Sequence, residues 1–404
     1  MVLMINRHKG AIIMGVYAAA REKQRSDASS TIPRILAALI VAAALAFGLG
    51  LAMPENAFAL KTINQKDYAL TEFDVQGHKY VKNKNLGKYE VTSYETNPVY
   101  PTTTHKYGTK KGYKATLETF MYLPVSYEAS GDMGNPQSFD ITPDGAYAYV
   151  TYPKAGSEDL GRIVRYDLKA LENIANDDDD IGFLVKATHT HSVGKELSDL
   201  EKEILACMKI GPWCKIGHGS TMAYNPKDGC LWFLGETVSN TSNMQRINMK
   251  TLKPDLKINF TFSSNEKLLV SNNLTFDKQG RCYFYNYSGS TGSFPEGAMR
   301  IYQGQITNNK KVSFRLTKVS VLNNPTRRIQ SMGYNPSSNR LYMVADEVIM
   351  SVPVKKLDKL KKKDVRLTIF KGAREYEDIA FDAKGNGYVM VNKRPELLAT
   401  SKGF

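Results

Sequence analysis

The chain has few of the residues on which small secreted scaffolds and zinc sites depend. It contains 4 cysteines, 6 histidines and 2 tryptophans among 404 residues. So few cysteines exclude a disulfide-dense miniprotein, and a hydrophobic content of 42% supplies a large core instead. No C-x-x-C pair and no Cys/His spacing typical of zinc occurs. We therefore expect no metal and no other cofactor, with calcium as the one alternative left open.

Two further patterns bear on metal binding. The histidines of the sequence THTHS, His189 and His191, lie on one face of an expected strand, but no third ligand is implied nearby. The acidic run 177–180 could attract calcium, yet the spaced D-x-D-x-D-G loop is missing. A solvated acidic loop is the preferred interpretation of this run.

The motifs of common enzyme classes are also missing. The sequence has no G-x-S-x-G, no H-E-x-x-H, no P-loop, no G-x-G-x-x-G after a strand and no sialidase Ser-x-Asp-x-Gly-x-Thr-Trp box. One His–carboxylate pair, His218 and Glu236, could act as a base and its orienting group, so these two residues are the catalytic candidates. The sequence favours binding over catalysis.

Long hydrophobic runs are absent except for one near the start. Residues 35–53 are apolar and uncharged, basic residues precede them, and the small-residue pattern Ala57-Phe58-Ala59 follows. This order is typical of a signal peptide, so we predict that residues 1–59 are removed and that no stable transmembrane anchor remains. The alternative is an uncleaved anchor, because the run is long enough to span a bilayer. The expected location is extracellular, either free or associated with the cell wall.

Negative charge is in deficit. The chain has 54 Lys+Arg against 40 Asp+Glu, a formal net charge of +14. A basic protein is attracted to polyanions. Because an exported chain does not normally meet intracellular nucleic acid, we expect no nucleic-acid partner and predict an anionic cell-wall polymer, or a surface glycan or protein of bacteria, instead. The basic run Lys355–Lys363 could contact such a polymer, although a solvated turn is the commoner role of such runs. Arg327 and Arg328 add positive charge before a repeated strand.

What the sequence does contain is an internal repeat. Each copy has a short apolar strand, a turn of Asp, Asn, Pro and Gly, and a second strand rich in aromatic residues. The copies are SFDITPDGAYAYVTY (138–152), STMAYNPKDGCLWFLGE (220–236), NLTFDKQGRCYFYNY (273–287), SMGYNPSSNRLYMVADE (331–347) and DIAFDAKGNGYVMVN (378–392). The turn residues are Gly145, Gly229, Gly280, Asn339 and Gly385, types that tolerate positive φ.

Repeats made only of strands predict a β-propeller. A third strand follows most hairpins, and further strand-like runs follow it, so each unit is expected to hold about four antiparallel strands. Five blades are visible, and a sixth within 60–137 is left open. The fifth unit lacks an outer strand, and we predict that the strand in 114–125 completes it. A β-sandwich is the alternative fold.

Three segments outside the repeats complete the domain plan. Residues 60–113, rich in Lys, Tyr and Thr, are expected to form an extended arm, and residues 114–404 the propeller. Apolar residues at helical spacing predict one small helical insert at about 192–210. Such inserts often shape a binding surface.

Polar residues recur just before the first strand and at the end of the second strand of each unit. In a propeller these positions converge on one face, which is the predicted binding rim. The rim residues are Gln137, Tyr152, His218, Glu236, Asn272, Tyr287, Gln330, Asp346, Glu377 and Asn392. The alternative is that strands simply end at water. Within this set, His218, Glu236, Tyr287, Asp346 and Gln330 are the favoured contacts.

The four cysteines are disulfide candidates because an even number in an exported chain permits two bridges. Cys207 and Cys214 bracket a short loop, and Cys230 and Cys282 occupy similar places in two repeats. Three pairings are formally open, and four unpaired thiols are the alternative.

The repeats resemble those of the helveticin J-type class III bacteriocins and related exported proteins of lactobacilli. The resemblance covers about 130–400 and depends on GNPQSFDITPDG, on GHGSTMAYNP followed by a strand ending at Glu236, and on NLTFDKQGRCYF. It implies a large secreted protein active against related Gram-positive bacteria, with His218 as a shared position. The arm, the cysteines and the insert depart from that pattern.

The expected function is therefore a secreted antibacterial protein that binds the cell envelope of related bacteria through one propeller face. A non-lethal adhesin or glycan-binding lectin is the first alternative. A propeller hydrolase or lyase acting on wall polymers is the second.

Overall fold

The structure is a computed structural model whose described residues all belong to one unit of the chain, Asn56–Phe404. They are 61–64, 70–72, 104–106, 115–128, 133–157, 159–177, 182–219, 222–235, 241–263, 273–287, 299–309, 311–322, 330–345, 348–370, 375–392, 395–402 and 404. The predicted signal peptide 1–59 lies outside the described residues. So does most of the arm 60–113.

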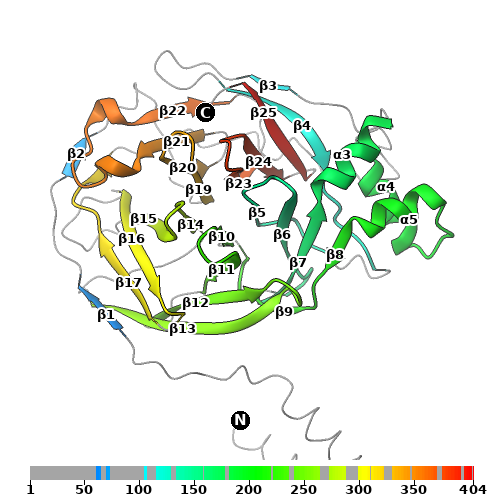
Figure 1. Cartoon of the computed structure of the whole chain (residues 1–404), viewed down its shortest axis with the longest axis horizontal. Coiled ribbons are helices and arrows are strands. Elements are labelled where there is room, and N and C mark those ends of the chain that lie inside the picture. Colours follow the sequence, from blue (N-terminus) through cyan, green and yellow to red (C-terminus); the bar gives the residue numbers. More distant parts are fainter. Residues whose placement is uncertain are drawn as a thin grey trace, which may run out of the picture. The chain divides into compact units, whose positions relative to one another are not determined.

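Five sheets form a ring around a central axis, so this unit is a five-bladed β-propeller, as the sequence predicted (Figure 1). The inner strand of each blade contacts the inner strands of its two neighbours, and the last blade closes on the first. Blade 1 holds β5 (Ser138–Ile141), β6 (Tyr147–Pro153), β7 (Leu160–Asp167), β8 (Met208–Ile210) and β9 (Cys214–Lys215). Blade 2 holds β10 (Ala223–Asn225), β11 (Cys230–Leu234), β12 (Thr241–Asn248) and β13 (Lys253–Ser263).

The other three blades follow the same plan from the axis outward. Blade 3 holds β14 (Thr275–Phe276), β15 (Arg281–Tyr287), β16 (Met299–Thr307), β17 (Lys311–Leu316) and β18 (Ser320–Leu322). Blade 4 holds β19 (Ser331–Asn335), β20 (Arg340–Ala345), β21 (Val348–Pro353) and β22 (Arg366–Ile369), with 3-10 turns η2 (Val354–Lys356) and η3 (Lys362–Asp364) before β22. Blade 5 holds β23 (Glu375–Phe381), β24 (Gly387–Asn392) and β25 (Glu396–Lys402).

The turn between the first two strands contains a residue with positive φ in every blade. All five predicted turn residues have positive φ, from 51° at Asn339 to 90° at Gly385. Side chains at the end of the inner strands hold these turns. Asp277 Oδ1, for example, accepts hydrogen bonds from the backbone N–H groups of Gln279 (2.9 Å) and Arg281 (3.0 Å). An Asp or Asn before the turn in four blades, with Thr142 in its place in blade 1, is the sequence signal of this motif.

The ring closes as predicted, by a strand from early in the chain. β4 (Thr116–Tyr122) pairs antiparallel with β25 and so becomes the fourth strand of blade 5. A buried hydrogen bond of 2.9 Å from Thr119 Oγ1 to Glu396 Oε2 joins these two strands. This pairing removes the exposed edge that β25 would otherwise present.

Three short strands of the arm add to outer edges of the ring (Figure 1). β1 (Lys61–Asn64) pairs parallel with β13 of blade 2, and β2 (Leu70–Glu72) pairs parallel with β18 of blade 3. β3 (Thr104–Lys106) pairs antiparallel with β4 of blade 5. Along the chain, the arm therefore supplies edge strands to successive parts of the circumference.

The helical insert is larger than the sequence suggested. Three helices occur among the described residues, all between β7 and β8: α3 (Leu168–Asp177), α4 (Phe183–Ser192) and α5 (Asp199–Ala206). Only α5 lies within the predicted helix at 192–210, and residues 208–210 of that range are strand β8. A capping box fixes the start of α5, because Ser198 accepts from the Glu201 N–H while the Glu201 carboxylate accepts from the Ser198 N–H.

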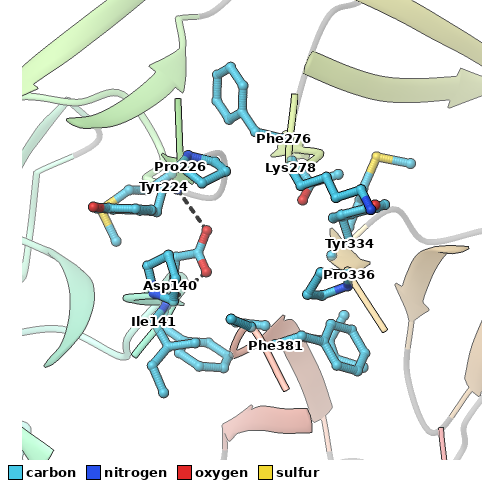
Figure 2. A pocket seen from close by; sticks show the side chains of 18 residues that line it. Asp140, Ile141, Tyr224, Pro226, Phe276, Lys278, Tyr334, Pro336 and Phe381 are labelled. Carbon is cyan, nitrogen blue, oxygen red and sulfur yellow. Dashed lines mark hydrogen bonds between the residues drawn. The ribbon is translucent and has the colours of Figure 1, made fainter. Parts of the chain in front are cut away.

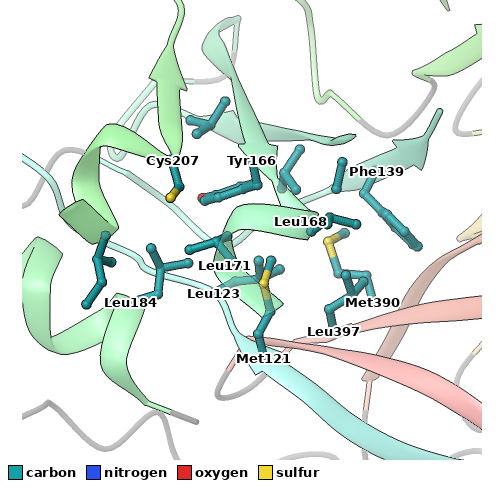
Figure 3. Close-up of a cluster of buried hydrophobic side chains, with 14 of the residues drawn as sticks. Met121, Leu123, Phe139, Tyr166, Leu168, Leu171, Leu184, Cys207, Met390 and Leu397 are labelled. Carbon is teal, nitrogen blue, oxygen red and sulfur yellow. The ribbon is translucent and has the colours of Figure 1, made fainter. Parts of the chain in front are cut away.

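Buried apolar side chains gather in five clusters, one at each seam between neighbouring blades. The cluster between blades 5 and 1 is shown in Figure 3. There Met121 of β4 and Met390 of β24 meet Phe139 of β5, and Leu171 of α3 and Leu184 of α4 extend the same cluster. The insert thus packs on the seam at which the ring closes.

Candidate functional site

Four of the ten predicted rim residues have side chains outside the described part of the chain. Glu236, Asn272 and Asp346 lie outside the described residues. Tyr287 ends β15 opposite Met299, but its side chain is also outside the described part. The predicted pair of His218 and Glu236 therefore remains a prediction. His218 itself is exposed in the loop between β9 and β10.

The other rim residues differ from an exposed polar ring. Tyr152 is 0% exposed, and its hydroxyl lies 2.8 Å from that of Tyr166, so it belongs to the core. Its position follows from strand alternation, because the ring of Tyr152 lies on the seam face of β6 with Val150.

Among the rim residues that the structure describes, one group comes together. Asn392 Nδ2 donates to Glu377 Oε1 at 2.8 Å and to the Pro136 carbonyl at 3.0 Å, and both side chains are buried. Gln137 is adjacent in sequence and half-buried, with its amide nitrogen 3.4 Å from the carbonyls of Asn135 and Pro136. Gln330, also half-buried, donates its backbone N–H to Val344 at 3.3 Å. Glu377 and Asn392 thus join blade 5 to blade 1 instead of facing solvent.

A described cavity lies on the propeller axis, at the opposite end of the inner strands. It has a volume of about 650 Å³, which includes the open solvent at its mouth, and residues of all five blades line it (Figure 2). Its mouth is formed by the first turn residue of each repeat: Pro143, Pro226, Lys278, Pro336 and Ala383. We call it the axial cavity.

Equivalent positions of the repeat form successive layers of the axial cavity. The last apolar residue of each inner strand gives one layer, namely Ile141, Tyr224, Phe276, Tyr334 and Phe381. Deeper residues include Phe139, Met222, Met332 and Ile379. Gly333 is needed at this depth, because a Cβ there would stand 2.3 Å from the carbonyl oxygen of Ile379.

Asp140 is the one carboxylate among the residues that line the axial cavity. Figure 2 shows its carboxyl group turned toward the centre of the ring. Oδ2 accepts the Tyr224 backbone N–H and Oδ1 accepts the Ile141 N–H, each at 2.7 Å. Burial raises the pKa of Asp140 to about 7, and these two hydrogen bonds oppose that rise. Asp140 thereby joins the inner strands of blades 1 and 2.

A second carboxylate repeats this arrangement one blade earlier. Asp378 of β23 accepts the Phe139 N–H of blade 1 at 2.8 Å and the Ile379 N–H at 2.7 Å. It is 1% exposed and does not line the axial cavity. Burial raises its pKa well above the ordinary value, and the nearby charge of Asp140 adds to the rise. We call Asp140 and Asp378 the inter-blade carboxylates.

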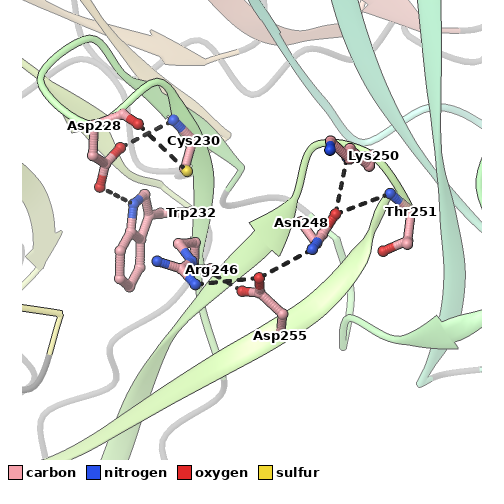
Figure 4. Close-up of polar contacts among 8 residues, drawn as sticks. All are labelled: Asp228, Cys230, Trp232, Arg246, Asn248, Lys250, Thr251 and Asp255. Atoms are coloured by element: carbon pink, nitrogen blue, oxygen red, sulfur yellow. Dashed lines mark hydrogen bonds and ion pairs between the residues drawn. The ribbon is translucent and has the colours of Figure 1, made fainter.

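Each blade also has polar contacts away from the cavity, which Figure 4 shows for blade 2. Asp228 accepts the Trp232 indole N–H at 2.9 Å, and Arg246 pairs with Asp255 at 2.9 Å. These contacts hold the hairpins of the blade and lie outside the cavity lining.

The metal predictions are corrected in one respect. His189 and His191 are on helix α4, not on a strand. Side chains two residues apart on a helix point to different sides, so the two imidazoles do not face each other. His191 instead stacks on Tyr127, with ring centroids 4.3 Å apart. Asp177 ends α3, and 178–181 lie outside the described residues. Within the described ranges, no group of three or more potential ligands could hold a metal ion.

The four cysteine candidates for disulfides are unpaired in the structure, which corresponds to the alternative of four thiols. Cys207 packs in the seam between blades 5 and 1, whereas Cys214 packs against the seam between blades 1 and 2, which separates them. Cys230 and Cys282 pack near one seam, but Cys282 is fully buried and burial raises its thiol pKa far above the ordinary value.

No family model and no curated protein matches this chain. Among solved structures, a glucose dehydrogenase aligns with 75% of this chain and 100% of its own at 12% identity and a TM-score of 0.34. A putative 6-phosphogluconolactonase from Bacteroides uniformis aligns with 74% of this chain and 77% of its own at 11% identity and a TM-score of 0.33. A streptogramin B lyase aligns with 72% of this chain and 98% of its own at 11% identity and a TM-score of 0.32. At such low identities and TM-scores, the activities named for these proteins are not assigned to this chain.

Among the described residues, no helix is long and apolar enough to cross a membrane.

Proposed function

We propose that this protein is a secreted binding protein that attaches to an anionic, phosphate-bearing polymer of the bacterial envelope. The observation that carries the proposal is a group of exposed lysines between β21 and β22 of blade 4. We call this group the lysine face, and it consists of Lys355, Lys359, Lys361 and Lys363. The helveticin J-type resemblance and the predicted signal peptide support an extracellular target.

The lysine face is held in place by apolar anchors. Val354, Leu357 and Leu360 alternate with the lysines and are buried in the seam cluster of blades 3 and 4. Because these anchors fix the backbone of the segment, the lysines project from fixed backbone positions. Less backbone freedom is then lost when a polymer binds.

The acidic residues of the same segment are already engaged. Asp358 accepts from both terminal nitrogens of Arg315 at 2.8 and 2.9 Å and from the Lys318 N–H at 2.9 Å. Asp364 pairs with Lys356 and accepts the Lys361 N–H at 3.0 Å. These contacts hold the pKa values of both carboxyls below the ordinary value despite burial. The positive charge of the lysine face is therefore left for a partner.

The test measures attachment of the purified protein to Gram-positive cell walls that carry or lack their phosphate polymer. A fourfold Lys→Gln variant of the lysine face is compared with a fourfold Lys→Gln control at Lys195, Lys215, Lys250 and Lys253, which are also exposed. We expect the first variant to bind at least tenfold more weakly. The slope of log affinity against log salt should fall by about 3 if all four lysines displace counterions.

Three results would overturn the proposal. Equal losses in both variants would indicate attraction by total charge alone. Unchanged binding to walls stripped of phosphate polymer would exclude that polymer as the target. Attachment to anionic phospholipid vesicles but not to walls would move the partner to a membrane.

Live Gram-positive cultures and the same cell walls also test whether the protein kills, adheres or cleaves. Growth inhibition of a bound strain is what the helveticin J-type resemblance implies, whereas binding without inhibition indicates an adhesin. Release of soluble wall fragments over time would indicate a hydrolase or lyase, and His218→Ala would then be the first variant to examine.

A further inference from the structure

We propose that the axial cavity binds an organic ammonium ligand, with Asp140 as its counter-ion and the apolar floor of the cavity against the ligand's hydrocarbon part. This site does not involve the lysine face, so it can exist whether or not the protein binds an envelope polymer.

The shape of the cavity fits a small organic molecule. Its wall comes from five inner strands that are locked together at the axis, so it is preformed. Its deeper lining is apolar, with Phe139, Met222, Met332 and Ile379, and Tyr224 and Phe276 belong to the next layer. A concave, mostly apolar space with few polar groups is the usual form of a small-ligand site.

The charge inside the cavity calls for a cation. Each Asp140 oxygen accepts one backbone N–H, at 2.7 Å, and a carboxylate offers about four acceptor positions, so two remain for a ligand. Within the described part of the chain, no basic side chain pairs with Asp140. A carboxylate that is desolvated without an ion partner is costly, and a bound ammonium group would supply the missing charge.

The other charged and titratable groups around Asp140 leave room for this role. Asp378 of β23 carries the same sign as Asp140, and Tyr224 of β10 has its pKa raised, mainly by burial. Lys278 is exposed in the β14–β15 turn, at the mouth of the cavity and not at its floor. It disfavours a cation by a modest amount, because water screens its charge.

The experiment titrates the full-length protein with three ligands of similar size by calorimetry. They are 2-phenylethylammonium, the neutral 2-phenylethanol and the anionic 3-phenylpropionate. We expect the ammonium ligand to bind at least tenfold more tightly than the other two. Its affinity should rise about tenfold per pH unit from pH 5.5 to 7 and level off above, because Asp140 must lose its proton to bind a cation.

Asp140→Asn and Asp378→Asn form a matched pair of variants. Each replaces an inter-blade carboxylate by its amide and weakens one pair of backbone contacts, to which Asp378 adds a side-chain contact with Ser331, but only Asp140 lines the cavity. We expect Asp140→Asn to lower ammonium affinity at least tenfold and to remove its pH dependence, while Asp378→Asn keeps both. Lys278→Met should raise the affinity about threefold, since it removes a screened repulsion.

Each opposite result overturns the proposal. If the neutral or the anionic ligand binds as well as the ammonium ligand, Asp140 is not a counter-ion. If both Asn variants lose affinity equally, the carboxylates act only by holding the inner strands together. If none of the three ligands binds at millimolar concentration, the cavity is not a site for this class of molecule.

Discussion

The inter-blade carboxylates share one pattern of backbone contacts and differ in their surroundings, since Asp378 also accepts a hydrogen bond from the Ser331 side chain. Asp140 and Asp378 each accept one N–H from the following residue and one from the inner strand of the next blade. Asp378 is closed off from solvent, whereas Asp140 faces a cavity that opens at the turn end of the ring. One arrangement thus serves assembly alone in one place and offers a charged group to a ligand in the other.

The largest expected effect comes from removing these carboxylates. Asp378→Ala leaves two buried N–H groups without acceptors, so we expect a loss of about 3–5 kcal/mol in the free energy of unfolding. Asp140→Ala should cost only about 1–2 kcal/mol, because water in the cavity can reach the freed groups. Urea denaturation of both variants measures the difference. Equal losses would show that solvent does not distinguish the two sites.

A smaller effect is expected from pH. Burial raises the pKa of Asp140 from 3.8 to about 7. Between these two pH values the folded state therefore binds more protons than the unfolded state. The free energy of unfolding should therefore fall as pH rises from about 4 to 7. Asp140→Asn should reduce that fall by about 1–3 kcal/mol.

The part of the fall due to Asp378 should persist in the Asp140→Asn variant, since its pKa is also raised. Chemical denaturation at several pH values provides the measurement. Identical pH profiles for the wild type and Asp140→Asn would contradict the assignment of a raised pKa to Asp140.

The smallest expected effect is that of Tyr152→Phe, which tests whether Tyr152 belongs to the core or to the binding rim. Tyr152→Phe leaves the buried Tyr166 hydroxyl without the partner that lies 2.8 Å away, so we expect a loss of about 1 kcal/mol. Thermal denaturation reports this loss, and attachment to cell walls should be unchanged. Weaker attachment at unchanged stability would return Tyr152 to the predicted binding rim.

The fold was predictable because its signals are local and repeated. A residue with positive φ in the turn and alternating strands recur five times, and an Asp or Asn precedes the turn in four of the copies, so each copy supports the others. Closure by β4 also followed from simple reasoning, because the fifth unit had one strand too few. The short helices were harder to predict, since α4 has a weak apolar pattern and the histidines of THTHS suit either a strand or a helix.

The site was harder to predict than the fold because the two ends of the inner strands look alike in sequence. The predicted rim lies at the end away from the turns, where Glu377 and Asn392 are buried and bonded to each other. The axial cavity lies at the turn end. The rim hypothesis passed over Asp140, although the sequence held a signal: it is the one acidic residue in its layer, where the other copies have Ala223, Thr275, Gly333 and Ala380. A charged residue at a position that is otherwise small and uncharged marks either a local contact or a site, and here it makes the contact.

The closing of blade 5 has a consequence for folding kinetics. The hydrogen bond between Thr119 and Glu396 joins residues 277 positions apart, and every contact between β4 and β25 has a similar separation. Contacts this distant in sequence raise the contact order and slow the search for the native state. The other blades are built mostly from consecutive strands, so they can form first. Until β25 meets β4, both strands present unpaired edges, and during that interval the protein is most exposed to aggregation.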